Sequence, residues 1–132
     1  PAFSARTVYE VDRSNLGNAH SHFVLVEGDE YGDERVPMFN LFASFRRAAG
    51  LVVNGGPRAA DEVRTAVGLG LPLVVVEGSG QLADELAQPT QAGEILTPAQ
   101  AAALRNEGKF VFVDGETKAG TIGKVLEALF SF

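Results

Sequence analysis

Two glycine-rich turns hold the residues of this sequence that are best suited to bind a ligand. Each turn follows a short apolar run and leads into a segment with helical spacing. The eight residues concerned are Gly55, Gly56, Pro57 and Arg58 in the first turn, and Gly78, Ser79, Gly80 and Gln81 in the second. Small residues where a strand leads into a helix are typical of the ligand-binding edge of an open α/β sheet.

The chemistry expected at such turns is the binding of phosphate. The first turn of a helix exposes N–H groups and a positive dipole end, and glycines let an anion approach them closely. Pro57 suits a helix start because its missing N–H would have no partner there. Arg58 can add charge and Ser79 a hydroxyl donor. Glycines also serve ordinary turns in any α/β protein, but two such turns after successive strands favour an anion site.

Neither turn has a complete nucleotide fingerprint, and no nucleophile with an adjacent base is visible. The turns match neither a Walker A loop nor a full Gly-x-Gly-x-x-Gly motif, which argues against generic ATPases and dehydrogenases. A hydrolase would have to use carboxylates, and Asp61 and Glu62 are the best placed. They could hold or activate a water or a ribose hydroxyl, although acids near a helix start are commonplace.

An acidic segment, residues 27–34, has two interpretations. It suits a solvated loop and helix start, where carboxylates favour the helix dipole. Its functional alternative is that Tyr31, Asp33 or Glu34 contacts the base or ribose of a ligand.

Two histidines precede this acidic segment. His20 and His22 are two residues apart, so they face the same way on a strand and could hold a metal with nearby carboxylates. Hydrogen bonding at a strand start is the simpler interpretation. We expect neither a metal site nor a cofactor.

The elements that position these residues alternate along the chain. Four short apolar runs predict strands at residues 23–26, 51–53, 73–76 and 110–113. Helical spacing recurs at residues 36–49, 61–69, 81–87, 99–107 and 118–130. Continuous apolar strands indicate a sheet covered on both faces, and the alternation predicts an α/β fold, Rossmann-like, with three α/β/α layers and a mainly parallel sheet. Residues 8–11 could form an edge strand, and residues 88–94 should be a loose surface connection.

The amino-acid composition limits the classes of partner that are expected. The 132 residues carry 11 Lys and Arg against 17 Asp and Glu, a net charge of −6, and the cations are scattered. Because a nucleic-acid surface needs clustered cations, nucleic acid is not an expected partner. Cysteine is absent, and no apolar run approaches the roughly 20 residues that span a bilayer. We expect a cytoplasmic location, no membrane insertion, and a small-molecule ligand, with a homo-oligomer as an open alternative.

Four blocks of sequence resemble a known family. They read Asn18-Ala-His20-Ser-His22-Phe23-Val-Leu-Val26, Tyr31-Gly32-Asp33-Glu34, Asn54-Gly55-Gly56-Pro57 and Gly78-Ser79-Gly80-x-x-Ala83-Asp84. In order and spacing the chain resembles the SLOG superfamily over residues 4–87, and more narrowly the prokaryotic relatives of the amino-terminal domain of TRPM channels. The resemblance implies a bacterial Rossmann-like domain that binds nucleotides or nucleotide-derived signals such as ADP-ribose-like molecules.

Three departures from the family pattern bear on function. The related LOG enzymes, which cleave nucleoside monophosphates, carry Gly-Gly-x-Gly-Thr-x-x-Glu; here Arg58 and Ala59 replace the Gly-Thr pair, while the acid falls on Glu62. Gln81 stands where relatives often have Arg. The family's first strand and glycine loop have no counterpart before Pro1, so we expect a single domain over residues 1–132 without that portion. Three explanations stay open: a fragment, a naturally short form, or a chain that borrows a neighbour's surface by dimerising.

The leading hypothesis is a non-catalytic domain that senses a nucleotide-type small molecule. One alternative is a LOG-like phosphoribohydrolase that uses Glu62 and Asp61. Another is an assembly or scaffold domain that keeps the fold without a ligand.

Overall fold

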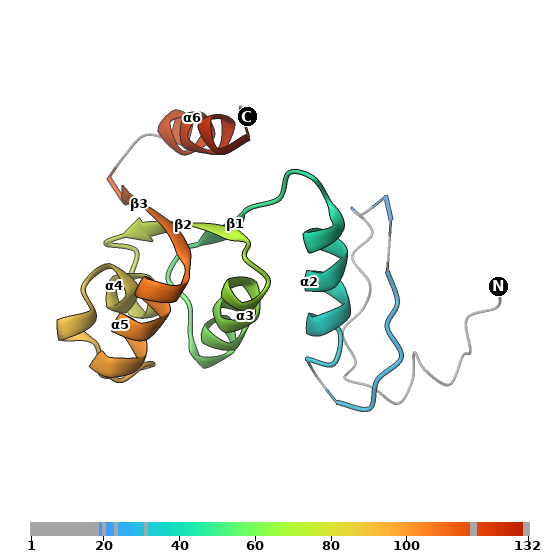
Figure 1. The fold of residues 1–132 in the computed structure, drawn as a ribbon, viewed down its shortest axis with the longest axis horizontal. Helices are drawn as coiled ribbons and strands as arrows, with labels where there is room; N and C mark the ends of the chain where they lie inside the picture. Colours follow the sequence, from blue (N-terminus) through green and yellow to red (C-terminus); the bar gives the residue numbers. More distant parts are fainter. Residues whose placement is uncertain (1–18, 20, 23, 31, 117–118, 131–132) are drawn as a thin grey trace. The chain divides into compact units, whose positions relative to one another are not determined.

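The protein divides into two compact units, Pro1–Met38 and Phe39–Phe132. The structure, a computed structural model, describes residues 19, 21–22, 24–30, 32–116 and 119–130 (Figure 1). The larger unit holds both glycine turns.

Three parallel strands form the sheet of the larger unit: β1 (Gly50–Val52), β2 (Pro72–Glu77) and β3 (Lys109–Asp114). They lie in the order β1-β2-β3, with Leu51 paired to Val74 and Val75 paired to Phe112. The central strand is the most deeply buried, since Val74 and Val75 are fully inaccessible. These strands confirm the predictions at residues 51–53, 73–76 and 110–113.

Alternate residues of β2 face two different helical layers. Leu73 and Val75 pack into a core with buried residues of α3 (Pro57–Gly68), α4 (Gln81–Ala87) and α5 (Pro98–Glu107). Val74 and Val76 face the other way and pack against α6 (Ala119–Phe130), which Figure 1 shows on the opposite side of the sheet. Because successive strand residues point to opposite faces, β2 is buried on both, which confirms the predicted α/β architecture with a Rossmann-like arrangement.

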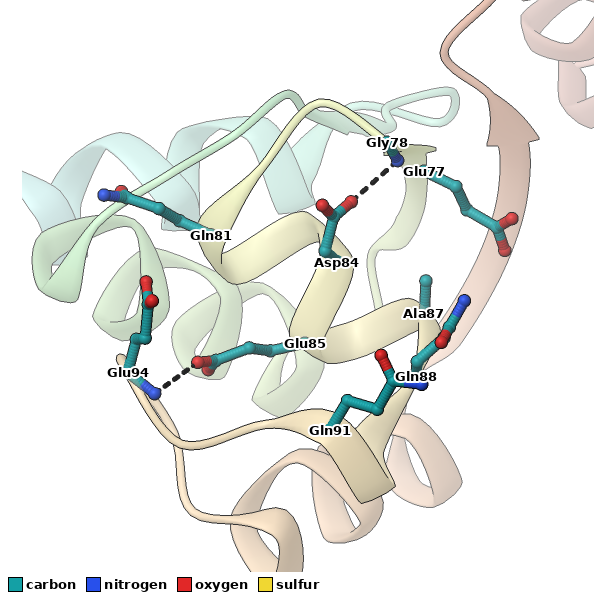
Figure 2. A pocket seen from close by; sticks show the side chains of 9 residues that line it. All are labelled: Glu77, Gly78, Gln81, Asp84, Glu85, Ala87, Gln88, Gln91 and Glu94. Carbon is teal, nitrogen blue, oxygen red and sulfur yellow. Dashed lines mark hydrogen bonds between the residues drawn. The ribbon is translucent and has the colours of Figure 1, made fainter.

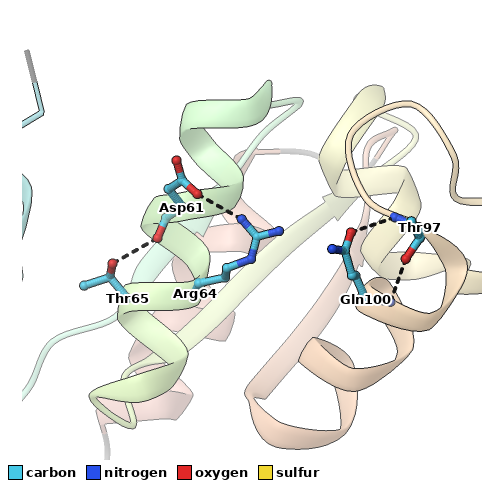
Figure 3. Close-up of polar contacts among 5 residues, drawn as sticks. All are labelled: Asp61, Arg64, Thr65, Thr97 and Gln100. Carbon is cyan, nitrogen blue, oxygen red and sulfur yellow. Dashed lines mark hydrogen bonds and ion pairs between the residues drawn. The ribbon is translucent and has the colours of Figure 1, made fainter.

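Local sequence signals explain where the helices begin. Helix α5 starts with a capping box in which the Thr97 hydroxyl and the Gln100 side chain each accept a backbone N–H (Figure 3). Helix α3 starts at Pro57, four residues before the predicted boundary, because proline is accepted at the first helical position. Helix α4 has the predicted bounds.

One predicted strand is wrong for the residues described. Val24, Leu25 and Val26 belong to no strand, and Val24 is 72% exposed. Apolar, β-branched composition makes a segment suitable for a sheet but does not supply the neighbouring strand with which it must pair. Residues 8–11, the predicted edge strand, and Phe23 lie outside the described residues.

Two further boundaries differ from expectation. Helix α2 (Arg35–Ser44) stops five residues before the predicted end at residue 49. The connection at residues 88–94 lies at the surface, as expected, but it is not loose, because it contains the 3₁₀ turn η1 (Pro89–Gln91) and the buried Ala92. None of the helices within the described residues is long and apolar enough to span a bilayer.

Candidate functional site

The two glycine turns lie side by side at the carboxyl edge of the sheet. Strands β1 and β2 are parallel neighbours, so their carboxyl ends meet at the same edge. Backbone hydrogen bonds join the turns directly: the N–H of Leu82 donates to the Gly55 carbonyl and that of Ala83 to the Asn54 carbonyl, both at 3.1 Å. The Asn54 N–H also donates to Ser79 Oγ at 2.7 Å. The fold thus brings together the two segments that the sequence singled out.

Backbone strain is concentrated at these turns. Among the described residues, Asn54 (φ 57°) and Gln81 (φ 38°) are the non-glycine residues with positive φ, one in each turn. Gly80, at φ 107°, would place a Cβ 3.4 Å from the Asn54 side-chain oxygen. Residues held in left-handed conformations cost about 1–3 kcal/mol each and cluster at functional sites. The strain marks this edge of the sheet as the first place to look for a ligand.

Of the two helix starts, that of α3 is the more accessible to an anion. Its cap residue, Gly56, has no side chain that could accept a hydrogen bond from the first turn. A Cβ built on Gly56 would meet open space. Within the described part of the chain, no side chain caps the N–H of Gly56 or of Ala59. Arg58 is exposed on the same helical turn. N–H groups and the helix dipole therefore face outward here.

At the start of α4 the protein already uses most of the equivalent groups. The Gly78 N–H donates to the Asp84 carboxylate at 2.7 Å (Figure 2). The N–H groups of Leu82 and Ala83 donate to backbone carbonyls of the first glycine turn. Ser79, expected as a hydroxyl donor to a ligand, donates instead to the Val76 carbonyl at 2.6 Å. The two turns consequently differ in how many N–H groups they leave for a ligand.

A polar hollow of about 340 Å³ adjoins the second turn (Figure 2). Its lining residues are Glu77, Gly78, Gln81, Asp84, Glu85, Ala87, Gln88, Gln91 and Glu94. Four of these side chains carry carboxylates, which repel phosphate and accept hydrogen bonds. This hollow suits hydroxyl or amino groups rather than an anion.

Glu85, which the sequence analysis missed, organises one wall of this hollow. Its side chain is only 6% exposed. Oε1 accepts hydrogen bonds from the N–H groups of Gly93, Glu94 and Ile95, and Oε2 from that of Leu96, at 2.6–3.1 Å. The sequence signal for Glu85 is its position on the apolar side of α4. That position does not reveal its hydrogen-bond partners, which lie in the loop at residues 93–96.

These hydrogen bonds determine the ionisation of Glu85. Burial raises the pKa of this carboxyl, and the hydrogen bonds from the four backbone N–H groups lower it more strongly. The pKa therefore lies below its ordinary value of 4.5, because an ionised carboxylate accepts these bonds better than a protonated one.

The carboxylates proposed for hydrolysis lie apart from the hollow. Asp61 is half-exposed on α3 and pairs with Arg64 at 2.9 Å (Figure 3). Glu62 is exposed on the same helix, and neither residue lines the hollow.

The acidic segment before α2 uses its carboxylates locally. Asp33 Oδ2 accepts hydrogen bonds from the N–H groups of Asp29 and Glu30, and Glu34 Oε2 accepts one from Gly32. These bonds close the turn that leads into α2, which confirms the loop and helix start expected there. Tyr31 lies outside the described residues.

The histidine pair is only half described, since His20 also lies outside those residues. His22 Nδ1 and Ser21 Oγ are 2.8 Å apart, within hydrogen-bond distance. No cluster of three or more His, Cys, Asp or Glu side chains in the described ranges could hold a metal ion.

A parallel sheet between helical layers, with glycine turns at its carboxyl edge, places this protein among the Rossmann-like α/β domains. Residues 2–120 match the family described as "SLOG in TRPM, prokaryote", and the chain belongs to that family. This confirms the resemblance found in the sequence.

Mammalian channels are also similar to the chain. The transient receptor potential cation channel subfamily M member 2 proteins of Mus musculus and Rattus norvegicus are each 30% identical to it over 102 residues. The match covers 61% of this chain but only 7% of each channel. The chain thus corresponds to a small part of these relatives. No solved structure matches it significantly.

Proposed function

We propose that this domain binds a nucleotide or nucleotide-derived ligand, of the ADP-ribose type, and senses it without hydrolysing it. The observation that carries this proposal is the uncapped start of α3 at the carboxyl edge of the sheet. Family membership supports it, because the family resemblance implies nucleotide-derived ligands. The lack of cysteine fits action in the cytoplasm.

The proposed ligand spans two environments. Its phosphates bind at residues 55–58, where N–H groups and the helix dipole favour negative charge, with Arg58 close by on the same turn. Gly80 and the strained Gln81 of the second turn contact the ligand beside the phosphates. The hollow lined by carboxylates then takes the part that carries hydrogen-bond donors, such as ribose hydroxyls or a base amino group. A bare phosphate would satisfy only the first environment.

A binding role is favoured over hydrolysis by the surroundings of the acids on α3. Asp61 is engaged with Arg64, and Glu62 is exposed outside the hollow. A general base needs a protected position within reach of the reacting group. Incubation with nucleoside monophosphates should release no free base. Release that Glu62→Ala abolishes would replace sensing with catalysis.

Calorimetry with ADP-ribose, AMP, ATP and NAD tests the binding itself. We expect at least one of these compounds to bind more tightly than inorganic phosphate, because it fills both environments. Absence of binding by all four would contradict the proposal.

Gly56→Asp tests the position of the phosphate. Asp is a preferred cap residue, and the Cβ meets open space, so the fold should be retained. The new carboxylate would occupy the N–H groups and repel phosphate, weakening nucleotide binding at least about tenfold. Gly123→Asp adds the same charge at an exposed position of α6, where the Cβ also meets open space, and should leave binding unchanged. Equal affinity of the Gly56→Asp variant and the wild type would refute this phosphate position.

A further inference from the structure

Helix α2 is apolar on nearly all sides, yet none of its ten residues is buried. The exposed fractions are 53% for Val36, 42% for Leu41 and 41% for Phe42, and Phe45 just beyond the helix is 56% exposed. A helix that is apolar all round is normally enclosed by protein. The described residues do not enclose this one.

An apolar hollow of about 440 Å³ lies beside the second half of α2, within the larger unit. The rings of Phe39, Phe42 and Phe45 line it together with Leu73 and Phe130. Phe39 and Phe42 meet edge to face, with ring centroids 6.4 Å apart. A contiguous apolar surface of this kind is typical of sites that bind a protein, a membrane or a ligand.

The charges at the two ends of α2 are opposite in sign. Glu30, Asp33 and Glu34 precede the helix, and Arg46 and Arg47 follow it; all five are exposed. Ten helical residues separate these groups by about 15 Å. Two copies of α2 packed antiparallel would therefore bring each acidic end against a basic end, twice over. Such a contact is self-complementary, as a twofold symmetric interface requires.

We propose that this face, formed by α2 and the apolar hollow beside it, binds the same face of a second copy of the chain. The apolar side chains drive the association, and the terminal charges set its antiparallel direction. The interface is separate from the proposed ligand site, since neither glycine turn lines the apolar hollow.

Sedimentation equilibrium and light scattering of the full chain test the association. The wild type should have twice the mass of one chain, and Leu41→Glu should raise the dimer dissociation constant at least about tenfold, with an unchanged circular dichroism spectrum. Leu69→Glu makes the same change at a leucine that is 39% exposed directly after the end of helix α3, and it should remain dimeric. A monomeric wild type overturns the proposal. This holds even if hydrogen exchange shows that another part of the same chain protects α2 from solvent.

Charge reversal tests the antiparallel direction. Arg46→Glu/Arg47→Glu makes both ends acidic, and Glu30→Lys/Glu34→Lys makes both ends basic. Each double variant alone should dissociate, because like charges then meet at both ends of the pair. An equimolar mixture should form a heterodimer of near wild-type affinity that weakens as salt is added. If the mixture is no more dimeric than its components, the proposed pairing is wrong.

Discussion

Replacing Glu85 by Gln would exchange one carboxylate oxygen for an amide NH₂ group and disrupt the support of a whole loop. In the wild type, Oε1 accepts three backbone N–H groups and Oε2 accepts that of Leu96 at 2.7 Å. Glutamine has nearly the same shape but only one acceptor oxygen. If that oxygen keeps its three partners, the amide NH₂ faces the Leu96 N–H, and two donors oppose each other. The opposite rotamer leaves the other three groups without an acceptor.

The expected loss follows from this geometry. Hydrogen bonds to a charged group contribute about 1.5–3 kcal/mol, and a buried donor without a partner costs about 1–3 kcal/mol. Since the contributions are not additive, we expect Glu85→Gln to lower the free energy of unfolding by about 2–3 kcal/mol at pH 7. In a chain of this size that corresponds to a fall of roughly 6–12 °C in melting temperature.

The loss should depend on pH with a defined sign. Because the folded-state pKa of Glu85 lies below its ordinary value of 4.5, its stabilising contribution is complete above that value. It disappears as the pH falls through the folded pKa. Wild type and Glu85→Gln should therefore converge in stability in acid.

Urea unfolding followed by circular dichroism, at several pH values from neutral to acid, measures this difference. Glu94→Gln is the matched control, since it makes the same change at an exposed residue of the same loop and should cost less than about 0.5 kcal/mol. An unchanged urea midpoint for Glu85→Gln at pH 7 would refute the role assigned to this carboxylate. A difference that grows in acid would refute the ionised state.

Three further substitutions test the local structure, each measured by thermal or urea unfolding. Thr97→Ala removes the capping box of α5 and should cost about 1 kcal/mol; no change would mean that the cap is dispensable. Ser79→Ala removes the hydroxyl that joins the turns through Asn54, with an expected loss of about 1–2 kcal/mol, and wild-type stability would contradict that link. Gly55→Ala should cost at least about 1–2 kcal/mol, because φ is 105° and the new methyl would lie 3.0 Å from that of Ala59; a neutral effect would show that the turn relaxes.

Much of the fold follows from local sequence alone. Short apolar runs predict strands β1, β2 and β3, and Thr97 followed by Pro98 is a local signal for the start of α5. These signals work because side-chain shape and capping hydrogen bonds act between near neighbours. Residues 24–26 show the limit: their composition suits a strand, but pairing depends on a partner elsewhere in the chain.

The candidate site, too, is determined partly by local sequence and partly by the tertiary structure. The sequence by itself determined that two glycine turns follow successive strands, and parallel strand order then requires them to share one edge. Only the tertiary structure decided which of their N–H groups face outward. The Asp84 carboxylate accepts a hydrogen bond from the Gly78 N–H, and backbone carbonyls of the first glycine turn accept those from the start of α4. The same holds for Glu85, whose four partners lie 8 to 11 residues away in a loop. Hydrogen bonds between segments depend on how those segments pack, and local residue preferences do not specify that packing.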